Sequence, residues 1–69
     1  MYGYSFGGKL AAKMFKMYLD ASPYCSNIEV HKPNKFGIVN VWWDCEIEGF
    51  LEQARNFGKM LNEQLYGVC

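Results

Sequence analysis

Residues 36–43 read FGIVNVWW, and this run decides the fold. Its β-branched and aromatic residues are typical of a β-strand. Successive side chains on a strand point to opposite faces of its sheet, so the adjacent Trp42 and Trp43 cannot share one core. A chain of 69 residues has little material to cover both faces. We therefore expect one tryptophan to lie in the core and the other to contact a partner.

A second strand comes before this run. Residues 27–32 alternate between apolar and polar side chains, and residues 33–35, PNK, are typical of a turn. The two strands are therefore predicted to form an antiparallel hairpin. A loop of two or four residues places Trp43 on the core face, whereas a loop of three residues places Trp42 there, because a slip of one residue turns a strand over. Both registers remain open at this point.

Helices are predicted on either side of the hairpin. Residues 9–21 are apolar over more than half of the helix circumference, which exceeds the one-sided stripe of a surface helix. This helix is either sandwiched or shared with a neighbour, so Phe15 and Leu19 are counted among the candidate interface residues. Residues 45–66 carry a narrower apolar stripe at helical period, and Asp44 is the expected N-cap of this second helix.

The order helix, strand, strand, helix predicts a small α+β domain with two layers, in which the hairpin packs on both helices. Residues 1–8, MYGYSFGG, form either a short additional strand or an irregular arm, with Ser5 as the expected cap of the first helix. We expect residues 1–69 to form a single domain. A core of this size is marginal in a monomer, and oligomerisation is one usual remedy. Pairing two hairpins edge to edge would give a four-stranded sheet and a homodimer.

The charges cancel over the whole chain but not within its halves. Seven basic and seven acidic residues leave no global field that would attract nucleic acid or a membrane. Residues 1–37 nevertheless carry a net charge of +3, and residues 38–69 carry −3. Lysines beside aromatic side chains are typical of surfaces that bind single-stranded nucleic acid, which is the alternative function. The candidate contacts are Lys9, Lys13, Lys16, Lys32 and Lys35.

One short motif is similar to a catalytic one. Residues 3–7, GYSFG, match G-x-S-x-G and locally resemble the nucleophile elbow of α/β-hydrolases. In that family a buried strand precedes the serine, and the acid and the histidine follow it in that order. Here only two residues precede the motif, and the sole histidine, His31, comes before the acidic candidate Asp44. We therefore expect no catalytic residue and no enzyme activity.

The cysteines do not form a metal-binding pattern. Cys25, Cys45 and Cys69 are widely spaced, and so is His31, whereas structural zinc sites use closely spaced ligand pairs. We expect no metal and no other cofactor. An odd number of cysteines, no signal-like segment and no long apolar run favour a reducing, cytoplasmic setting without a membrane. Whether Cys25 and Cys45 pair in a disulfide stays open.

Together these features predict a small, non-enzymatic protein-interaction module. We expect it to act as an inhibitor, adaptor or accessory subunit by occupying a surface on a larger protein, and to form a homodimer. A chain of 69 residues with its own start methionine has the size of accessory proteins common in phages and mobile elements, and we expect such an origin. The candidate interface residues are Phe36, Ile38, Trp42, Phe15 and Leu19.

Overall fold

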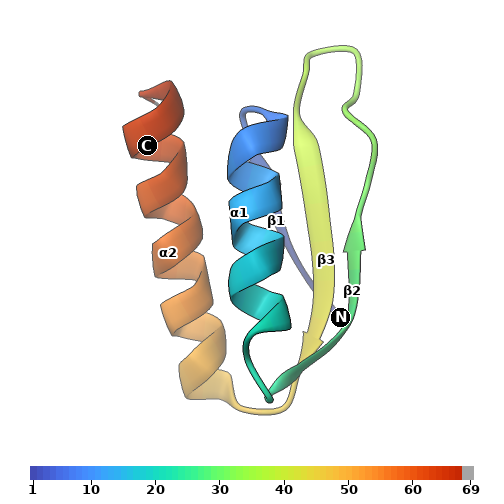
Figure 1. Cartoon of the computed structure of the whole chain (residues 1–69), viewed down its shortest axis with the longest axis vertical. Coiled ribbons are helices and arrows are strands. Elements are labelled where there is room, and N and C mark those ends of the chain that lie inside the picture. Colours follow the sequence, from blue (N-terminus) through green and yellow to red (C-terminus); the bar gives the residue numbers. More distant parts are fainter. Residues whose placement is uncertain (68–69) are drawn as a thin grey trace.

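A computed structural model describes residues 1–67 as a three-stranded antiparallel sheet and two helices (Figure 1). The α+β class predicted from the sequence is confirmed, and the N-terminal residues form a strand. The sheet has the order β1-β3-β2, so β3 is the central strand. In chain order the elements are β1 (Tyr2–Phe6), α1 (Lys9–Asp20), β2 (Cys25–Val30), β3 (Val39–Cys45) and α2 (Glu48–Tyr66).

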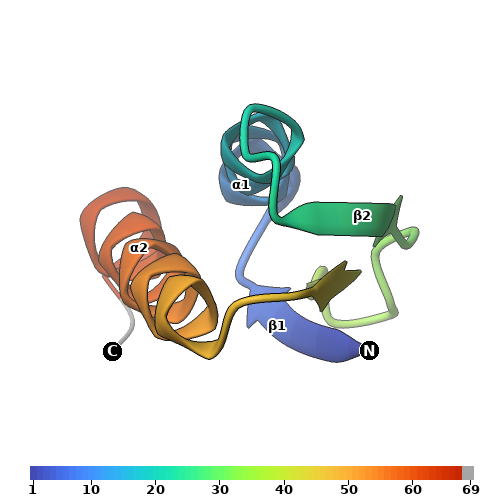
Figure 2. The same cartoon turned by 90° about the horizontal axis from the view of Figure 1, so that it is seen from below.

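Both helices lie on the same side of the sheet (Figure 2). α1 contacts all three strands, and α2 contacts β1 and β3 as well as α1. Within residues 1–67 the opposite side of the sheet carries no helix, so this part of the chain forms two layers. Neither helix in residues 1–67 has the length and apolar character needed to cross a membrane.

The core lies between the sheet and the helices and is rich in aromatic rings. Phe6, Phe15 and Trp43 have no exposed area. The ring centroid of Phe15 lies 4.9 Å from that of Phe6 and 5.2 Å from that of Trp43. Full burial of a large apolar side chain contributes about 1.5–3 kcal/mol. Of the two registers left open by the sequence, the structure therefore adopts the one that places Trp43 in the core.

The hairpin loop is longer than predicted, because β3 begins at Val39 and not at residue 36. Residues 31–38 form the connection between β2 and β3. The Asn34 side chain folds this loop, since its Oδ1 accepts hydrogen bonds from the backbone N–H groups of Phe36 and Ile38 at 2.9 and 3.0 Å. Gly37 adopts the left-handed conformation with φ of 79°. The asparagine and glycine thus bend residues that an extended strand would otherwise include.

β1 adds a third strand to the predicted two-stranded hairpin. Its inward side chains, Tyr2, Tyr4 and Phe6, recur at every second residue, as a strand with one buried face requires. β1 pairs with β3 along its whole length, from Tyr2 opposite Trp43 to Phe6 opposite Val39. The expected four-stranded sheet from two paired hairpins is therefore wrong, because each copy already has three strands.

Both predicted helix caps are wrong. Ser5 lies within β1, and Gly8 occupies the N-cap position of α1. Asp44 lies within β3, and α2 begins later, after Ile47, because the Glu46 N–H still bonds to the Tyr24 carbonyl at 3.1 Å. Continued pairing with the chain before β2 therefore delays the start of the helix.

Candidate functional site

The side of the sheet without helices is the candidate site. Along β3, Val39, Val41 and Trp43 are buried, so the residues between them face the opposite way. We call this surface the open face. It consists of Gly3, Ser5, Ser26, Glu29, Asn40, Trp42 and Asp44.

Trp42 is the large aromatic residue of the open face, and 38% of its surface is exposed. Its six-membered ring lies over Gly3 of the neighbouring strand, where an added β-carbon would come within 2.6 Å of the Trp42 Cε3. The centroid of the His31 ring lies 6.4 Å from that of Trp42. The indole therefore lies flat across β1 because residue 3 has no side chain.

A shallow hollow of about 560 Å³ lies beside the Trp42 ring. It extends across β1 from the open face to Arg55 on α2. Within its lining the Ser5 hydroxyl donates a hydrogen bond to Oδ1 of Asn40 at 2.6 Å. Aromatic rings next to hydroxyl, amide and guanidinium groups suit a polypeptide, which offers both apolar side chains and backbone polar groups. The complete lining is Met1, Tyr2, Gly3, Tyr4, Ser5, Asn40, Trp42 and Arg55.

β1 is an edge strand, and the backbone groups of Gly3 and Ser5 point away from β3. The His31 N–H bonds to the Asn40 carbonyl at 2.9 Å, so the backbone of Asn40 faces β2. In an antiparallel ladder this direction alternates from one residue to the next. Ser5 is the partner of Asn40 in the register, so its N–H and C=O face the outer edge. The same holds for Gly3, two residues earlier.

Part of this outer edge is covered by α2. The Asn62 side chain is buried, donates to the Ser5 carbonyl at 3.0 Å and accepts from the Gly7 N–H at 3.0 Å. Its amide thus takes the place of a neighbouring strand at one end of β1. Gly3 lies nearer the start of β1 and belongs to the lining of the hollow. An extended segment can pair with an exposed strand edge of this kind.

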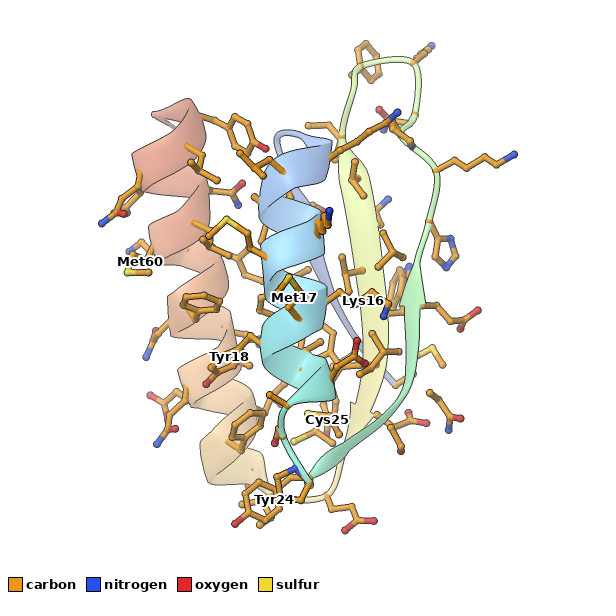
Figure 3. All side chains as sticks on the ribbon, viewed as in Figure 1. Lys16, Met17, Tyr18, Tyr24, Cys25 and Met60 are labelled. Atoms are coloured by element: carbon orange, nitrogen blue, oxygen red, sulfur yellow. The ribbon has the colours of Figure 1, made fainter. Side chains whose placement is uncertain are left out.

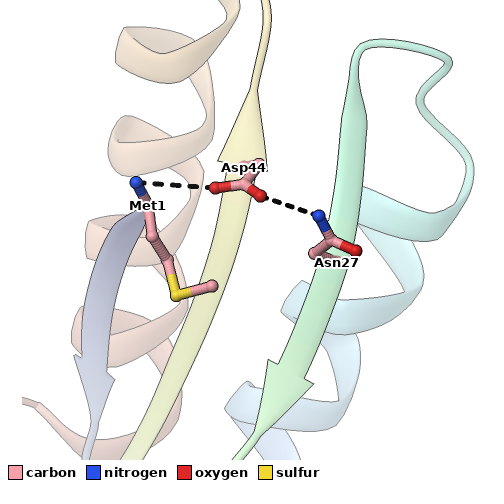
Figure 4. Close-up of polar contacts among 3 residues, drawn as sticks. All are labelled: Met1, Asn27 and Asp44. Atoms are coloured by element: carbon pink, nitrogen blue, oxygen red, sulfur yellow. Dashed lines mark hydrogen bonds and ion pairs between the residues drawn. The ribbon is translucent and has the colours of Figure 1, made fainter.

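Asp44 connects the three strands at one end of the open face (Figure 4). One carboxylate oxygen accepts a hydrogen bond from the Asn27 Nδ2 at 2.8 Å, and the other lies 3.5 Å from the N-terminal ammonium of Met1. The Asn27 hydrogen bond, and after it the ammonium group, lower the pKa of the Asp44 carboxyl group from its usual value. Asp44 therefore ties β1 and β2 to β3 and is charged at neutral pH.

Of the predicted interface residues, only Trp42 lies on the open face. Phe36 lies in the loop with 74% of its surface exposed, and Ile38 is half-buried at the end of that loop. Phe15 and Leu19 have no exposed area and belong to the core, so their assignment to an interface is wrong. Their helix packs against both the sheet and α2. Its apolar residues Leu10, Met14 and Met17 nevertheless stay exposed.

The five predicted lysines do not all lie together. Lys9 and Lys13 of α1 and Lys32 of the loop line a hollow of about 350 Å³ together with His31. The start of α1 and the hairpin loop lie at the same end of the molecule (Figure 1). Lys35 lies over the Phe36 ring, 5.1 Å from its centroid. Lys16 instead bonds to Asp20 one turn later on α1, at 2.6 Å. Three of the five lysines thus share one hollow.

The other chemically interesting residues have structural contacts. Gly7 and Gly8 lie against the Tyr66 ring, and the Tyr66 hydroxyl accepts a hydrogen bond from the Ala11 N–H at 3.1 Å. The glycines of the G-x-S-x-G motif therefore make room for aromatic rings. Within residues 1–67, no three His, Cys, Asp or Glu side chains gather in a way that would hold a metal ion. Cys69 lies outside the described residues.

Sequence reasoning missed Gly3, Arg55 and Asn62. The alternation of small and aromatic residues in the N-terminal segment was the available signal for Gly3, whereas Asn62 and Arg55 lie in a helix whose polar residues all look alike in sequence. A comparison of this chain with protein-family models, curated proteins and solved structures found no match. The function is therefore inferred from the geometry of the site.

Proposed function

We propose that the chain is a small protein-interaction module without catalytic activity, which binds a larger protein through the open face and the edge of β1. In this role it acts as an inhibitor, adaptor or accessory subunit. Binding of a second copy to the same surface would make a homodimer. A reducing, cytoplasmic setting is compatible with the free thiols of Cys25 and Cys45.

The observation that carries this proposal is the position of Trp42. A tryptophan on the central strand, held flat over Gly3 and left 38% exposed, is a pre-ordered apolar surface. Tryptophan is enriched at the energetic centres of interfaces, where its truncation commonly costs 2 kcal/mol or more. Because the indole is already fixed by the backbone beneath it, little side-chain entropy is lost on binding.

The edge of β1 suggests how the partner binds. An extended segment can add to an exposed strand through backbone hydrogen bonds, with pockets for alternate side chains giving specificity. The outward backbone groups of Gly3 lie in the hollow beside Trp42, and Arg55 lies in the same lining. A partner segment with an apolar residue for Trp42 and an acidic residue for Arg55 fits this surface.

The test compares Trp42→Ala with Phe36→Ala, because both remove an exposed aromatic ring and only Trp42 belongs to the open face. Each tagged protein is used for affinity capture from host lysate, and the purified proteins are examined by light scattering. The proposal expects the wild type and Phe36→Ala to retain the same partner or second copy, and Trp42→Ala to lose it. Equal retention by all three proteins would refute the proposal.

A second candidate function has support from the hollow between α1 and the hairpin loop. Its rim carries Lys9, Lys13 and Lys32 and no acidic side chain. Such a basic site suits a phosphate backbone, and phosphate contacts make binding strongly dependent on salt. Titration of a single-stranded oligonucleotide at several salt concentrations tests this function. Lys13→Ala should reduce both affinity and salt dependence, whereas Lys16→Ala, which removes a lysine paired with Asp20, should change neither.

A further inference from the structure

Cys25 and Cys45 face each other directly across β2 and β3. The neighbouring pair is hydrogen-bonded, because the Glu46 N–H donates to the Tyr24 carbonyl at 3.1 Å. Hydrogen-bonded and non-hydrogen-bonded pairs alternate along an antiparallel ladder, so the cysteines form a non-hydrogen-bonded pair. At such a pair the Cα atoms are about 4.5 Å apart, and disulfides span Cα separations of about 4.4–6.8 Å. The pairing of Cys25 with Cys45 is therefore of the kind whose backbone spacing suits a disulfide.

The two side chains also lie on the same side of the sheet. Both are half-buried and pack against the core. Cys25 lies near the end of the molecule where Tyr24 lies (Figure 3). The pKa of the Cys25 thiol is raised to about 11. Burial is the largest cause, and the nearby Cys45 side chain adds to it. The Cys45 Sγ also donates to the Ile47 carbonyl at 3.1 Å. Both thiols are free in this structure.

We propose that Cys25 and Cys45 are a site of reversible oxidation, at which a cross-strand disulfide forms by exchange with a small-molecule disulfide such as oxidised glutathione. The thiolate of one cysteine attacks the small disulfide, forms a mixed disulfide and releases one glutathione thiolate. The second cysteine then attacks the protein sulfur of the mixed disulfide. This step forms the cross-strand disulfide and releases the second glutathione thiolate. The two cysteines lose two electrons in total, and the two protons pass to the departing glutathiones.

The disulfide would close a covalent loop that contains all of β2, the hairpin loop and β3. This inference goes beyond the proposed function and does not depend on the identity of a partner. β2 is irregular near this site, because its register shifts between Ser26 and Glu29 and Asn27 has a positive φ of 52°. A covalent bond at Cys25 would hold the start of this strand to the end of β3. Because the Cys25 thiol is mostly protonated at neutral pH, exchange that starts from it is slow and accelerates as pH rises.

The experiment uses the full chain with Cys69→Ser, so that Cys25 and Cys45 are the two remaining cysteines. The protein is equilibrated at low concentration with mixtures of oxidised and reduced glutathione, quenched with acid and analysed by mass spectrometry. The proposal expects a monomer lighter by two hydrogen atoms, with a proteolytic fragment that links Cys25 to Cys45. Accumulation of glutathione adducts, of intermolecular dimers or of the unchanged dithiol in oxidised glutathione would overturn it.

The Tm of the oxidised and reduced forms provides a second measurement, which distinguishes an unstrained disulfide from a strained one. Closing a loop of this length should raise the Tm of the oxidised Cys69→Ser protein by at least about 10 °C over its reduced form. Cys45→Ser in the same background removes the partner and should show no redox-dependent change of Tm. A Tm that falls on oxidation would show that the native strand spacing does not accommodate the bond, and would refute the site.

Discussion

A β-carbon on Gly3 would lie 2.6 Å from both Cε3 and Cζ3 of Trp42, so the indole of the central strand rests on bare backbone of the neighbouring strand. Two residues far apart in sequence thus define one surface. Gly3 supplies the space and Trp42 fills it, and the hollow beside the ring extends to Arg55 of α2. The site depends on this contact as much as on the exposure of the tryptophan.

Gly3→Ala should displace the Trp42 ring. The methyl group overlaps ring atoms, and overpacking typically costs about 1–3 kcal/mol when neighbours must shift. We expect a change in Trp42 fluorescence, a lower free energy of unfolding in urea and weaker partner binding. Gly49→Ala is the matched control, because nothing lies within 4 Å of its added β-carbon and alanine favours the helix. Wild-type fluorescence and binding in Gly3→Ala would contradict the contact.

Trp43→Ala should mainly destabilise the chain. Trp43 has no exposed area and its ring lies 5.2 Å from that of Phe15, so truncation leaves a cavity in the core. Losses for large aromatic residues in cores are about 3–5 kcal/mol. Urea unfolding followed by far-ultraviolet circular dichroism measures the effect. Trp43→Phe, which keeps an aromatic ring at the site, should lose clearly less, and equal losses in the two variants would argue against aromatic packing here.

Asn62→Ala should destabilise the chain although the residue is polar. Removal of the buried amide leaves the Ser5 carbonyl and the Gly7 N–H without their partner, and an unsatisfied buried group costs about 1–3 kcal/mol. Asn56→Ala is the matched control, since Asn56 is exposed on the same helix. Chemical denaturation of both variants gives the comparison. If the two lose equally little stability, Asn62 does not hold the edge of β1.

Stability should fall at acid pH partly through Asp44. Its pKa in the folded chain is lowered, so its contribution is complete above the unfolded pKa of about 3.9 and is lost as pH falls through the lower folded value. Urea unfolding of the wild type and of Asp44→Asn across this pH range measures the contribution. The wild type should lose its advantage over the variant on acidification. A difference that is independent of pH would show that the ionised carboxylate is not the stabilising species.

The sequence predicted the elements better than their ends. The period-2 and period-3.6 patterns correctly gave the hairpin and both helices, and the adjacent tryptophans correctly predicted a residue outside the core. Asp44 looked like a helix cap because its short acidic side chain precedes a helix, yet in the structure it accepts hydrogen bonds across the sheet from Asn27. Whether Asp44 caps the helix or bonds to Asn27 depends on how the strands pair. The local sequence around Asp44 does not contain this information.

The candidate site was only partly predictable for the same reason. Trp42 could be found from its neighbour Trp43, since strand geometry alone separates their faces. Phe36 looked like part of the strand, but the Asn34 side chain bends the chain before Val39 and leaves Phe36 in the loop. The hollow across β1 depends on the docking of α2, which brings Arg55 to Tyr4 from the other end of the chain. Such long-range contacts have no signature in a single sequence.

The most direct test of the open face as a protein-binding surface is the affinity of Trp42→Ala for the captured partner, or for itself, measured together with its free energy of unfolding. Loss of a central tryptophan worth at least 2 kcal/mol lowers affinity by roughly 30-fold or more. Because 38% of the Trp42 surface is exposed, truncation of Trp42 should cost less stability than truncation of the fully buried Trp43. A 30-fold loss of affinity in a stably folded variant would support the account. Unchanged affinity and unchanged self-association in Trp42→Ala would contradict it.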